Sequence, residues 1–512
     1  MKRRNFWTSV FIFTTFFTAA LSALVFAGKS GTVKVGMRYD PSTVNMLEMR
    51  LASDIPVVLP IHQSLMGADL ESGKRVPLLA ESLTVMENGK DIRVKLRTDV
   101  KFHTGDPLIA ADVKWTYEEC ANPSNANMMA GPLDEIEDIE ILDDHNLIFR
   151  FYDPYAAWQE LMWIGICSKK YFDKVGKKKF RSHPVGSGAF RFVERKIGES
   201  VTLEAVEDFP EYDVGFKTLK FVTVPDDVTR LAMLETGELD LVSGVLPHQL
   251  RRLKRNKQVK IKTSDNVPSL FGMAALPLTD PVMADAYLGR AIRHAINRQE
   301  IVDKIFLGQG YPLYMFASKS ELGYDPTVKF DFNPAKSREL LKKSSYKPGQ
   351  ELILTYTSLT PNAPLVAAVV QKYLKDVGIT VKLQQLEEGL AATYTRSRDK
   401  RLGHLRLYGW PGGRDPSTRL LLSVLSTSPY ATVTNRPKKE EFDALVLAQA
   451  RETDVEKRRA MLKEIHGIMT EDAVGTFLFG LKMIYATSDR IEYNWTPDEA
   501  YKVNLHTIKI VK

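Results

Sequence analysis

The chain has 512 residues, of which 44% are hydrophobic and 26% are charged. This length suggests two or three domains, and the composition excludes a largely disordered chain and a polytopic membrane protein. The formal net charge of +7 is a small excess for so long a chain and does not indicate nucleic-acid binding. We expect the basic runs at residues 177–179 and 251–257 to be solvated faces.

The N-terminal segment has the pattern of a secretory signal. A basic start at residues 2–4 precedes an apolar run at about residues 6–26, and the small residues Val25 and Ala27 fit a cleavage site. We therefore predict a signal peptide at residues 1–27, cleaved after Ala27. An uncleaved membrane anchor is the alternative.

The same segment bears on the route of export. The pair Arg3-Arg4 resembles a twin-arginine signal, whereas the Phe-rich apolar core favours general secretion. No cysteine follows the apolar run, so a lipid anchor is not indicated. Without the first 27 residues, 67 basic residues stand against 63 acidic ones, a net charge of +4. We expect a periplasmic protein that is not lipid-anchored.

The first half of the mature chain reads mainly as strands. The segment at 32–39 has the composition of a buried strand, and 91–97 and 146–152 alternate apolar and polar residues as half-buried strands do. Residues 225–242 predict a helix followed by a short strand, with Asp226 or Asp227 as the cap and Gly237 at the end.

The second half alternates helices and strands. Residues 285–306 predict one helix, with Leu288, Ile292 and Ile296 on one stripe. Further elements are predicted as a β-α-β unit, two late helices and a final strand: 351–357, 363–376, 378–386, 438–451, 454–470 and 503–511. This is an α/β chain with strands at both ends. If the final strand returns to the first domain, the chain crosses between lobes more than once, and pockets between lobes are common ligand sites.

Residues that could carry catalysis do not form a recognisable set. The nine histidines show no close metal-binding spacing, and His103 fits a turn-bonding role better than a ligand or base. Ser187 is not in a GxSxG motif, and no phosphate-binding or dinucleotide-binding loop is present. Cys120 and Cys167 could form one disulfide in an oxidising compartment or remain free. The enzyme hypothesis has no positive support, and no metal or cofactor is expected.

Several segments resemble one family in order. Residues 76–123, "VPLLAESLTVMENGKDIRVKLRTDVKFHTGDPLIAADVKWTYEECANP", resemble the signature region of family 5 extracellular solute-binding proteins. These are the oligopeptide-, dipeptide- and nickel-binding components of ABC transporters. Further segments are similar to the family in the same order: 184–194, 224–245, the "LGRAIRHAINRQEIVDKIFLGQGYP" stretch and the late helical pair.

The resemblance implies a periplasmic-binding-protein type α/β fold, with two main lobes, an extra domain and a hinge. Domain I would combine residues 28–71, 186–275 and 485–512, with domain II at 72–185 and domain III at 276–484. The implied function is capture of a peptide or peptide-like solute between domains I and III, by hinge closure, for an ABC permease. We expect a monomer without catalytic activity. The alternatives are an exported hydrolase and a receptor that feeds a membrane sensor.

The resemblance also draws attention to "GWPGGRDP", residues 409–416. In peptide-binding members an acidic residue about three positions after the tryptophan pairs with the ligand's α-amino group, but here that position is Gly413. Arg414 would favour an anionic ligand group if it faces the cleft and would select nothing if it faces solvent. We expect Trp410 to wall the pocket and Asp415 to cap the next helix rather than anchor an amine.

Two other residues complete the candidate ligand-binding set. Tyr408 precedes the same loop, and Met273 lies where family members often have a polar element. Met273 is expected either in the pocket wall or in the core. The absent acid at Gly413 weakens the case that the ligand is an ordinary peptide.

Overall fold

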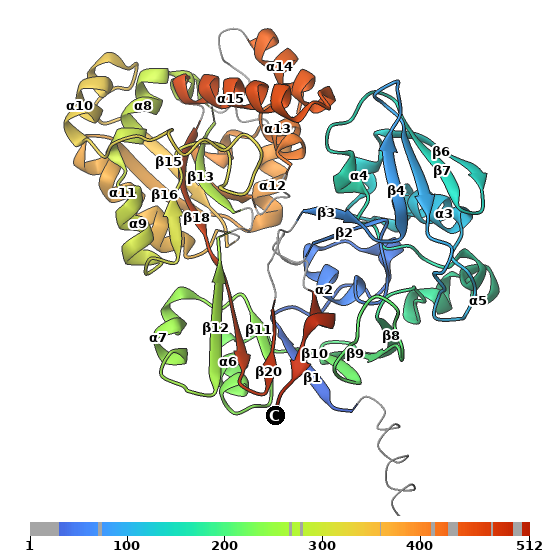
Figure 1. The fold of residues 1–512 in the computed structure, drawn as a ribbon. Coiled ribbons are helices and arrows are strands. Elements are labelled where there is room, and N and C mark those ends of the chain that lie inside the picture. Colours follow the sequence, from blue (N-terminus) through green and yellow to red (C-terminus); the bar gives the residue numbers. More distant parts are fainter. Residues whose placement is uncertain are drawn as a thin grey trace, which may run out of the picture.

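The computed structural model describes residues 30–69, 74–265, 269–276, 280–358, 360–410, 415–428, 439–472, 475–494 and 504–512. The predicted signal peptide, residues 1–27, lies outside them. Three lobes, each built around its own sheet, make up the molecule (Figure 1). No helix among the described residues is long and apolar enough to cross a membrane.

The lower lobe in Figure 1 contains a seven-stranded sheet. Its strands, in spatial order, are β12 (Val259–Ser264), β19 (Met483–Ser488), β11 (Leu241–Ser243), β1 (Thr32–Met37), β10 (Thr218–Thr223), β9 (Ser200–Ala205) and β8 (Phe190–Lys196). Strand β1 runs parallel to both β10 and β11, and the outer strands are antiparallel. Helices α6 (Asp227–Glu235) and α7 (Leu250–Leu253) belong to this lobe.

The lobe on the right of Figure 1 contains an antiparallel four-stranded sheet. Its strands are β4 (Ala80–Val85), β5 (Ile92–Leu96), β7 (Asn146–Phe151) and β6 (Ile136–Asp143), with a separate hairpin of β2 (Met66–Ala68) and β3 (Arg75–Pro77). Its helices are α3 (Ala110–Ala121), α4 (Ala130–Leu133) and α5 (Lys169–Ser182), and α2 (Ile55–Val58) packs between this core and that of the seven-stranded lobe. Cys120 and Cys167 are free thiols in the core of this lobe, so the structure has no disulfide between them.

The upper left lobe contains a six-stranded sheet. Its strands are β14 (Gly310–Pro312), β18 (Gly475–Leu481), β13 (Leu270–Ala275), β17 (Leu405–Trp410), β15 (Glu351–Tyr356) and β16 (Thr380–Gln385). One face packs on α8 (Ala286–Ala295), α9 (Arg298–Ile305) and α11 (Ala363–Asp376). Helices α12 (Glu388–Ser397), α13 (Ser417–Ser423), α14 (Lys439–Arg451) and α15 (Val455–Glu471) contribute to the cores of the other side, and α10 (Pro334–Lys343) packs on α8.

The seven-stranded and six-stranded lobes are connected through two places in the chain. The first runs from β12 into β13, and the second from β18 into β19, with only Lys482 between those strands. Strand β13 belongs to the six-stranded sheet, so the predicted end of domain I at residue 275 falls one strand too late. The family resemblance implied this bound, and the structure places the change of lobe before β13 rather than after it.

Two predicted elements differ from the structure. The helix predicted at 285–306 is two helices, because Ile296 has an extended backbone and Asn297 caps α9 by accepting a hydrogen bond from the Glu300 N–H at 3.0 Å. The final strand is only β21 (Lys509–Ile510), paired with the two-residue strand β20 (Ile491–Glu492). It nevertheless returns to the seven-stranded lobe, where Leu505 and Ile508 are buried beside β1.

Candidate functional site

The parallel strands of two sheets end at one crevice between two lobes. Strands β1 and β11 lead into Arg38 and Gly244 on the side of the seven-stranded lobe, and the chain after β15 supplies Pro361 and Asn362 on the other side. The crevice has a volume of about 400 Å³. Ligands of open α/β sheets bind outside the carboxyl ends of parallel strands, which makes this crevice the leading candidate.

Two polar side chains at the crevice are placed for contact with a ligand. Tyr39 is 61% exposed, which is unusual for a large aromatic residue. Asn362 has a left-handed backbone (φ 53°) at the start of α11, and its side chain makes no capping hydrogen bond there. Asparagine adopts this left-handed conformation more readily than most residues.

A cavity within the six-stranded lobe adjoins the crevice through one loop. Thr357 and Thr360 line the cavity, and Pro361 and Asn362 of the same loop line the crevice. The cavity has a volume of about 280 Å³. Its other walls come from β13, β17, β18, α12 and neighbouring segments: Ala274, Leu276, Phe316, Glu388, Ala392, Thr395, Leu402, Arg406, Leu407, Tyr408, Gly409, Ser423, Val424, Met469, Gly475 and Phe477.

Strand register decides which side chains reach this cavity. In the antiparallel pair of β13 and β17, Ala274 is opposite Arg406, and both line the cavity. Met273 is opposite Leu407, and both belong to the core on the other face because successive side chains alternate, although Leu407 also contributes to the cavity wall. Met273 is 1% exposed and does not line the cavity, so of its two predicted positions the structure shows the core. Tyr408 lines the cavity.

An arginine and a glutamate face each other across the cavity wall. Arg406 donates from Nη1 to Thr395 Oγ1 at 2.6 Å and from Nη2 to Glu388 Oε1 at 3.4 Å. Burial lowers the pKa of Arg406, and the nearby Glu388 opposes that shift. Glu388, Ala392 and Thr395 share one face of α12 because they are four and three residues apart.

Three polar atoms of the cavity residues have no hydrogen-bond partner among the described residues. They are Arg406 Nε, Glu388 Oε2 and Thr360 Oγ1, and all three are buried. Buried polar groups are normally hydrogen-bonded, so unsatisfied groups in a cavity wall are available to a bound molecule.

The glycine that opens the motif at 409–416 has a packing role. A Cβ atom at Gly409 would lie 2.4 Å from the ring of Phe271, its cross-strand neighbour on β13. The rings of Phe271 and Phe479 then stack at 5.2 Å in the core. Only glycine therefore fits here without displacing this ring.

Asp415 is held by a buried arginine. Arg458 of α15 donates to both carboxylate oxygens of Asp415, at 2.5 and 2.6 Å, and to Ser417 Oγ at 2.7 Å. Asp415 Oδ1 also accepts a hydrogen bond from the Ser417 N–H at the start of α13, at 2.8 Å. The carboxylate thus fixes the beginning of α13.

The remaining predicted site residues are described only in part. Trp410 ends β17 with its backbone paired to Leu270, and the position of its side chain lies outside what the structure describes. Gly413 and Arg414 lie outside the described residues. The structure therefore brings together Tyr408 and the wall of a cavity, and it separates Met273 from that wall.

Sequence reasoning missed the polar residues of the cavity and the crevice: Tyr39, Thr357, Thr360, Asn362, Glu388, Thr395 and Arg406. One signal was available. Arg406 is a charged residue inside the apolar strand "LRLYGW", at even spacing from Tyr408. The others come from loops and from a helix far away in the sequence.

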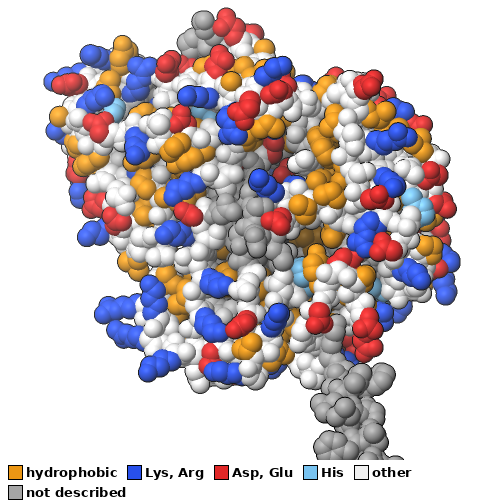
Figure 2. Space-filling view, in the orientation of Figure 1, with side chains coloured by type: hydrophobic (Ala, Val, Ile, Leu, Met, Phe, Trp, Pro, Cys, Tyr) orange, Lys and Arg blue, Asp and Glu red, His pale blue; other side chains and the backbone are white. Residues whose placement is uncertain are grey.

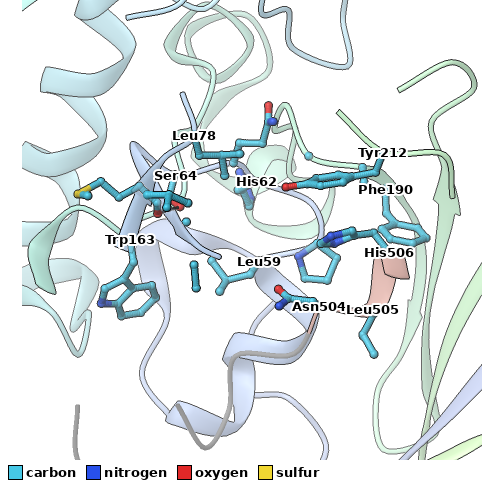
Figure 3. A pocket seen from close by; sticks show the side chains of 18 of the residues that line it. Leu59, His62, Ser64, Leu78, Trp163, Phe190, Tyr212, Asn504, Leu505 and His506 are labelled. Atoms are coloured by element: carbon cyan, nitrogen blue, oxygen red, sulfur yellow. Dashed lines mark hydrogen bonds between the residues drawn. The ribbon is translucent and has the colours of Figure 1, made fainter. Parts of the chain in front are cut away.

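A second cavity lies at the junction of the seven-stranded and four-stranded lobes (Figure 3). It has a volume of about 210 Å³; the ring of His506 stacks on Tyr212 with 3.9 Å between centroids, and Trp163 lies on the opposite side of the opening. Burial lowers the pKa of His62 to about 3 and that of His506 to about 4, so both rings are neutral. The residues lining this cavity do not include any from the six-stranded lobe.

The glycine-rich segment at 184–190 packs closely against residues 60–61 beside this cavity. The ring Nε2 of His103 lies 2.9 Å from the carbonyl oxygen of Gly188. The backbone N–H of His103 donates a hydrogen bond to the carbonyl oxygen of Gly186, also at 2.9 Å. A Cβ atom at Gly186 or Gly188 would lie within 2.5 Å of the backbone oxygens of Ile61 or Pro60. His103 therefore bonds a turn, as predicted. The described residues contain no group of three metal-ligating side chains.

The two basic runs of the sequence lie on the surface. Lys and Arg side chains gather over α7 at the lower left of Figure 2, where Arg251, Arg252, Lys254, Arg255 and Lys257 are exposed. The lysines at 177–179 are exposed as well, so both basic runs are solvated faces, as predicted. Hydrophobic side chains gather along the inner edge of the four-stranded lobe, facing the six-stranded lobe (Figure 2).

Comparison with known proteins places this arrangement in a family. The sequence profile described as "Bacterial extracellular solute-binding proteins, family 5 Middle" matches residues 74–432, well over half of the chain. The chain belongs to the family 5 bacterial extracellular solute-binding proteins. This is a family of binding proteins and not of enzymes, which accords with the absence of any catalytic motif in the sequence.

Similar proteins match the family 5 chain over almost its full length. A glutathione-binding protein (GsiB) of Escherichia coli O6:K15:H31 is 25% identical over 498 residues, covering 94% of this chain and 95% of that protein. The ABC transporter substrate-binding protein CtaP of Listeria monocytogenes is 23% identical with a TM-score of 0.86, covering 94% of this chain and 100% of that chain. A periplasmic binding protein of Helicobacter pylori, DppA, solved with the peptide STSA, is 21% identical with a TM-score of 0.76 and coverages of 94% and 99%. These structures show the periplasmic-binding-protein fold.

Proposed function

We propose that this family 5 protein is the exported receptor of an ABC importer and captures a peptide or peptide-like small solute. The observation that carries the proposal is the crevice at the carboxyl ends of parallel strands from two lobes, with a side cavity in one of them. The seven-stranded lobe, the four-stranded lobe and the six-stranded lobe correspond to domains I, II and III. The solute lies between I and III.

Closure follows from how the two lobes are linked. Among the elements that the structure describes, the β12–β13 and β18–β19 steps are the two at which the chain passes between these lobes, and two such connections allow a hinge. Ligand contacts with both lobes would favour the closed form, which the permease in the inner membrane then recognises. The protein acts as a monomer without a cofactor.

The nature of the solute is supported by relatives. The E. coli relative is named for binding glutathione, and the H. pylori structure contains a tetrapeptide. Peptides and modified peptides are therefore the first compounds to test. Export rests on the signal pattern at residues 1–27, and intact mass of the protein from the periplasm tests it by showing whether the chain begins at Gly28.

The binding test uses protein stripped of ligand by unfolding and refolding. Melting temperature is measured with glutathione, a set of tripeptides, opines and oligosaccharides, since a ligand at 100 times its Kd stabilises the folded state by about 2.7 kcal/mol. Mass spectrometry of what co-purifies with the untreated protein identifies the natural ligand. We expect peptides or peptide-like compounds to raise the melting temperature. An effect confined to oligosaccharides would overturn the peptide proposal.

A further inference from the structure

The cavity of the six-stranded lobe has room for a side chain of a ligand. An apolar cavity of about 150 Å³ holds a benzene molecule, whereas pockets for whole drug-sized ligands begin at about 300 Å³. The cavity here, at about 280 Å³, is just below that bound, and Thr360 of its wall is followed in the chain by Pro361 and Asn362, which line the interlobe crevice. It is therefore suited to a side branch of a ligand whose main body lies in the crevice.

Most of the cavity wall is apolar. Phe477, Leu276 and Val424 line it, together with Met469 of α15 and Phe316, whose ring lies 5.4 Å from that of Phe477. A ligand branch that buries carbon atoms against these residues gains hydrophobic free energy in proportion to its area.

The charges of the wall compensate each other. Arg406 and Glu388 are the two charged residues among the residues that line the cavity, and they lie within 3.4 Å. The side chains of Arg406 and Glu388 are 17% and 33% exposed, so a third charge would enter a partly buried site in which the two existing charges offset each other. Taking an unpaired charge out of water into such a site is unfavourable.

The same wall offers unsatisfied hydrogen-bonding atoms. Arg406 Nε donates, Glu388 Oε2 accepts, and the hydroxyl of Thr360 does either, and none has a partner among the described residues. A neutral amide satisfies both a donor and an acceptor at once. A carboxylate could satisfy the donor but would be repelled by Glu388, and an ammonium group would be repelled by Arg406.

From this geometry we propose that the cavity is a specificity pocket that receives an uncharged side chain of the captured peptide-like solute, with a terminal amide preferred. The proposal rests on the proposed function and goes further by naming the chemistry of one ligand position. Glutamine fits the description, whereas glutamate of the same shape does not. Lysine is excluded in the same way.

The test compares isosteric side chains by isothermal titration calorimetry. The probes are alanine tripeptides with glutamine, glutamate, leucine or lysine at one position at a time. At the position that enters the cavity, we expect the glutamine peptide to bind at least about tenfold more tightly than the glutamate peptide, with leucine between them and lysine weak. Equal affinities for glutamine and glutamate at all three positions would overturn the proposal.

Two variants assign the effect to this cavity. Glu388→Gln removes the negative partner of Arg406. The ratio of the affinities for the glutamine and glutamate peptides should therefore fall at least tenfold or invert. Ala392→Leu fills the cavity and should weaken binding of the glutamine peptide at least tenfold more than it weakens binding of trialanine. Ala368→Leu makes the same change at an exposed position of α11, outside the cavity, and should leave the affinities for all the peptides unchanged. Melting temperatures verify that each variant folds.

The outcomes separate this proposal from the proposed function. If tripeptides bind but neither Glu388→Gln nor Ala392→Leu changes their ranking, the cavity proposal is wrong and the receptor function stands. If no tripeptide and no glutathione binds the wild-type protein, both are wrong.

Discussion

Arg458 holds the chain at Asp415, near the end of the motif at residues 409–416. It is 5% exposed and contacts Asp415, Ser417 and Gln449, so one buried cation organises residues from three helices and the loop before α13. The carboxylate of Asp415 is therefore occupied and is not free to bind an amine. The recognition of a ligand amine, if it occurs, needs another acceptor.

Replacing Arg458 with alanine should be strongly destabilising. Loss of one partner leaves the largely buried carboxylate of Asp415 uncompensated, which typically costs about 3–5 kcal/mol. Urea unfolding measures the change. Arg459→Ala on the same helix removes only an exposed ion pair with Glu456 and should cost less than about 1 kcal/mol. An equal loss of unfolding free energy in the two variants would contradict a buried ion pair between Arg458 and Asp415.

His466 makes the stability dependent on pH. It is 2% exposed in α15, and burial lowers its pKa to about 3, with a smaller contribution from Arg419. An unfolded histidine titrates near 6.5, so the unfolded chain takes up the proton first as pH falls. The stability that this neutral ring provides is complete above about pH 6.5 and is lost progressively toward pH 3.

We therefore expect His466→Leu to flatten the pH dependence. Between pH 6 and pH 4, the slope of unfolding free energy against pH should fall by about 1.4 kcal/mol per pH unit, which corresponds to one proton. A slope should remain, because burial also lowers the pKa values of His62, His103 and His506, to about 3, 4 and 4. Urea unfolding across this pH range gives the slope, and an unchanged slope would mean that His466 titrates normally.

At the level of elements, strands β13 and β17 form the boundary between a packed core and the cavity. Their register sends Met273 and Leu407 to one face and Ala274 and Arg406 to the other. Gly409 ends this alternation at the point where the ring of Phe271 occupies the space that a side chain would need. The geometry of this strand pair thus positions Tyr408 and the start of the following loop.

Gly409→Ala should displace the ring of Phe271 and destabilise the fold by about 1–3 kcal/mol. Adding Phe271→Leu should relieve the clash, so the double variant is more stable than the sum of the single changes predicts. Gly467→Ala is a control of opposite sign. Its Cβ would meet no atom within 4 Å, and alanine favours the helix by up to about 1 kcal/mol. If the stability changes of Gly409→Ala and Phe271→Leu simply added in the double variant, the predicted clash between residue 409 and the Phe271 ring would be contradicted.

Elements with local signals could be predicted from the sequence. The parallel unit of β15, α11 and β16 and the helices α14 and α15 lie where the periodicity places them, and Asp226 caps α6. The break at Ile296 was missed because its apolar side chain continues the helical stripe. The cavity was missed because Thr360, Glu388 and Arg406 lie in a loop, a helix and a strand that come together only in the folded lobe.

At the scale of the whole molecule, the two lobes beside the crevice can be labelled without disturbing the site. Val228 on α6 and Leu365 on α11 are 60% and 59% exposed, near the first turns of helices that flank the crevice. Both native cysteines are fully buried, so thiol-reactive spin labels would attach at introduced cysteines. Val228→Cys and Leu365→Cys in one chain therefore report the separation of the lobes.

The most direct test of the account is the distance between these two labels, measured by pulsed electron paramagnetic resonance with and without ligand. The probe is the tripeptide that raises the melting temperature most. We predict a shorter and narrower distance distribution at saturating peptide, because closure brings the lobes together around the solute. A distribution that does not change while calorimetry shows saturation would contradict capture by closure between the seven-stranded and six-stranded lobes.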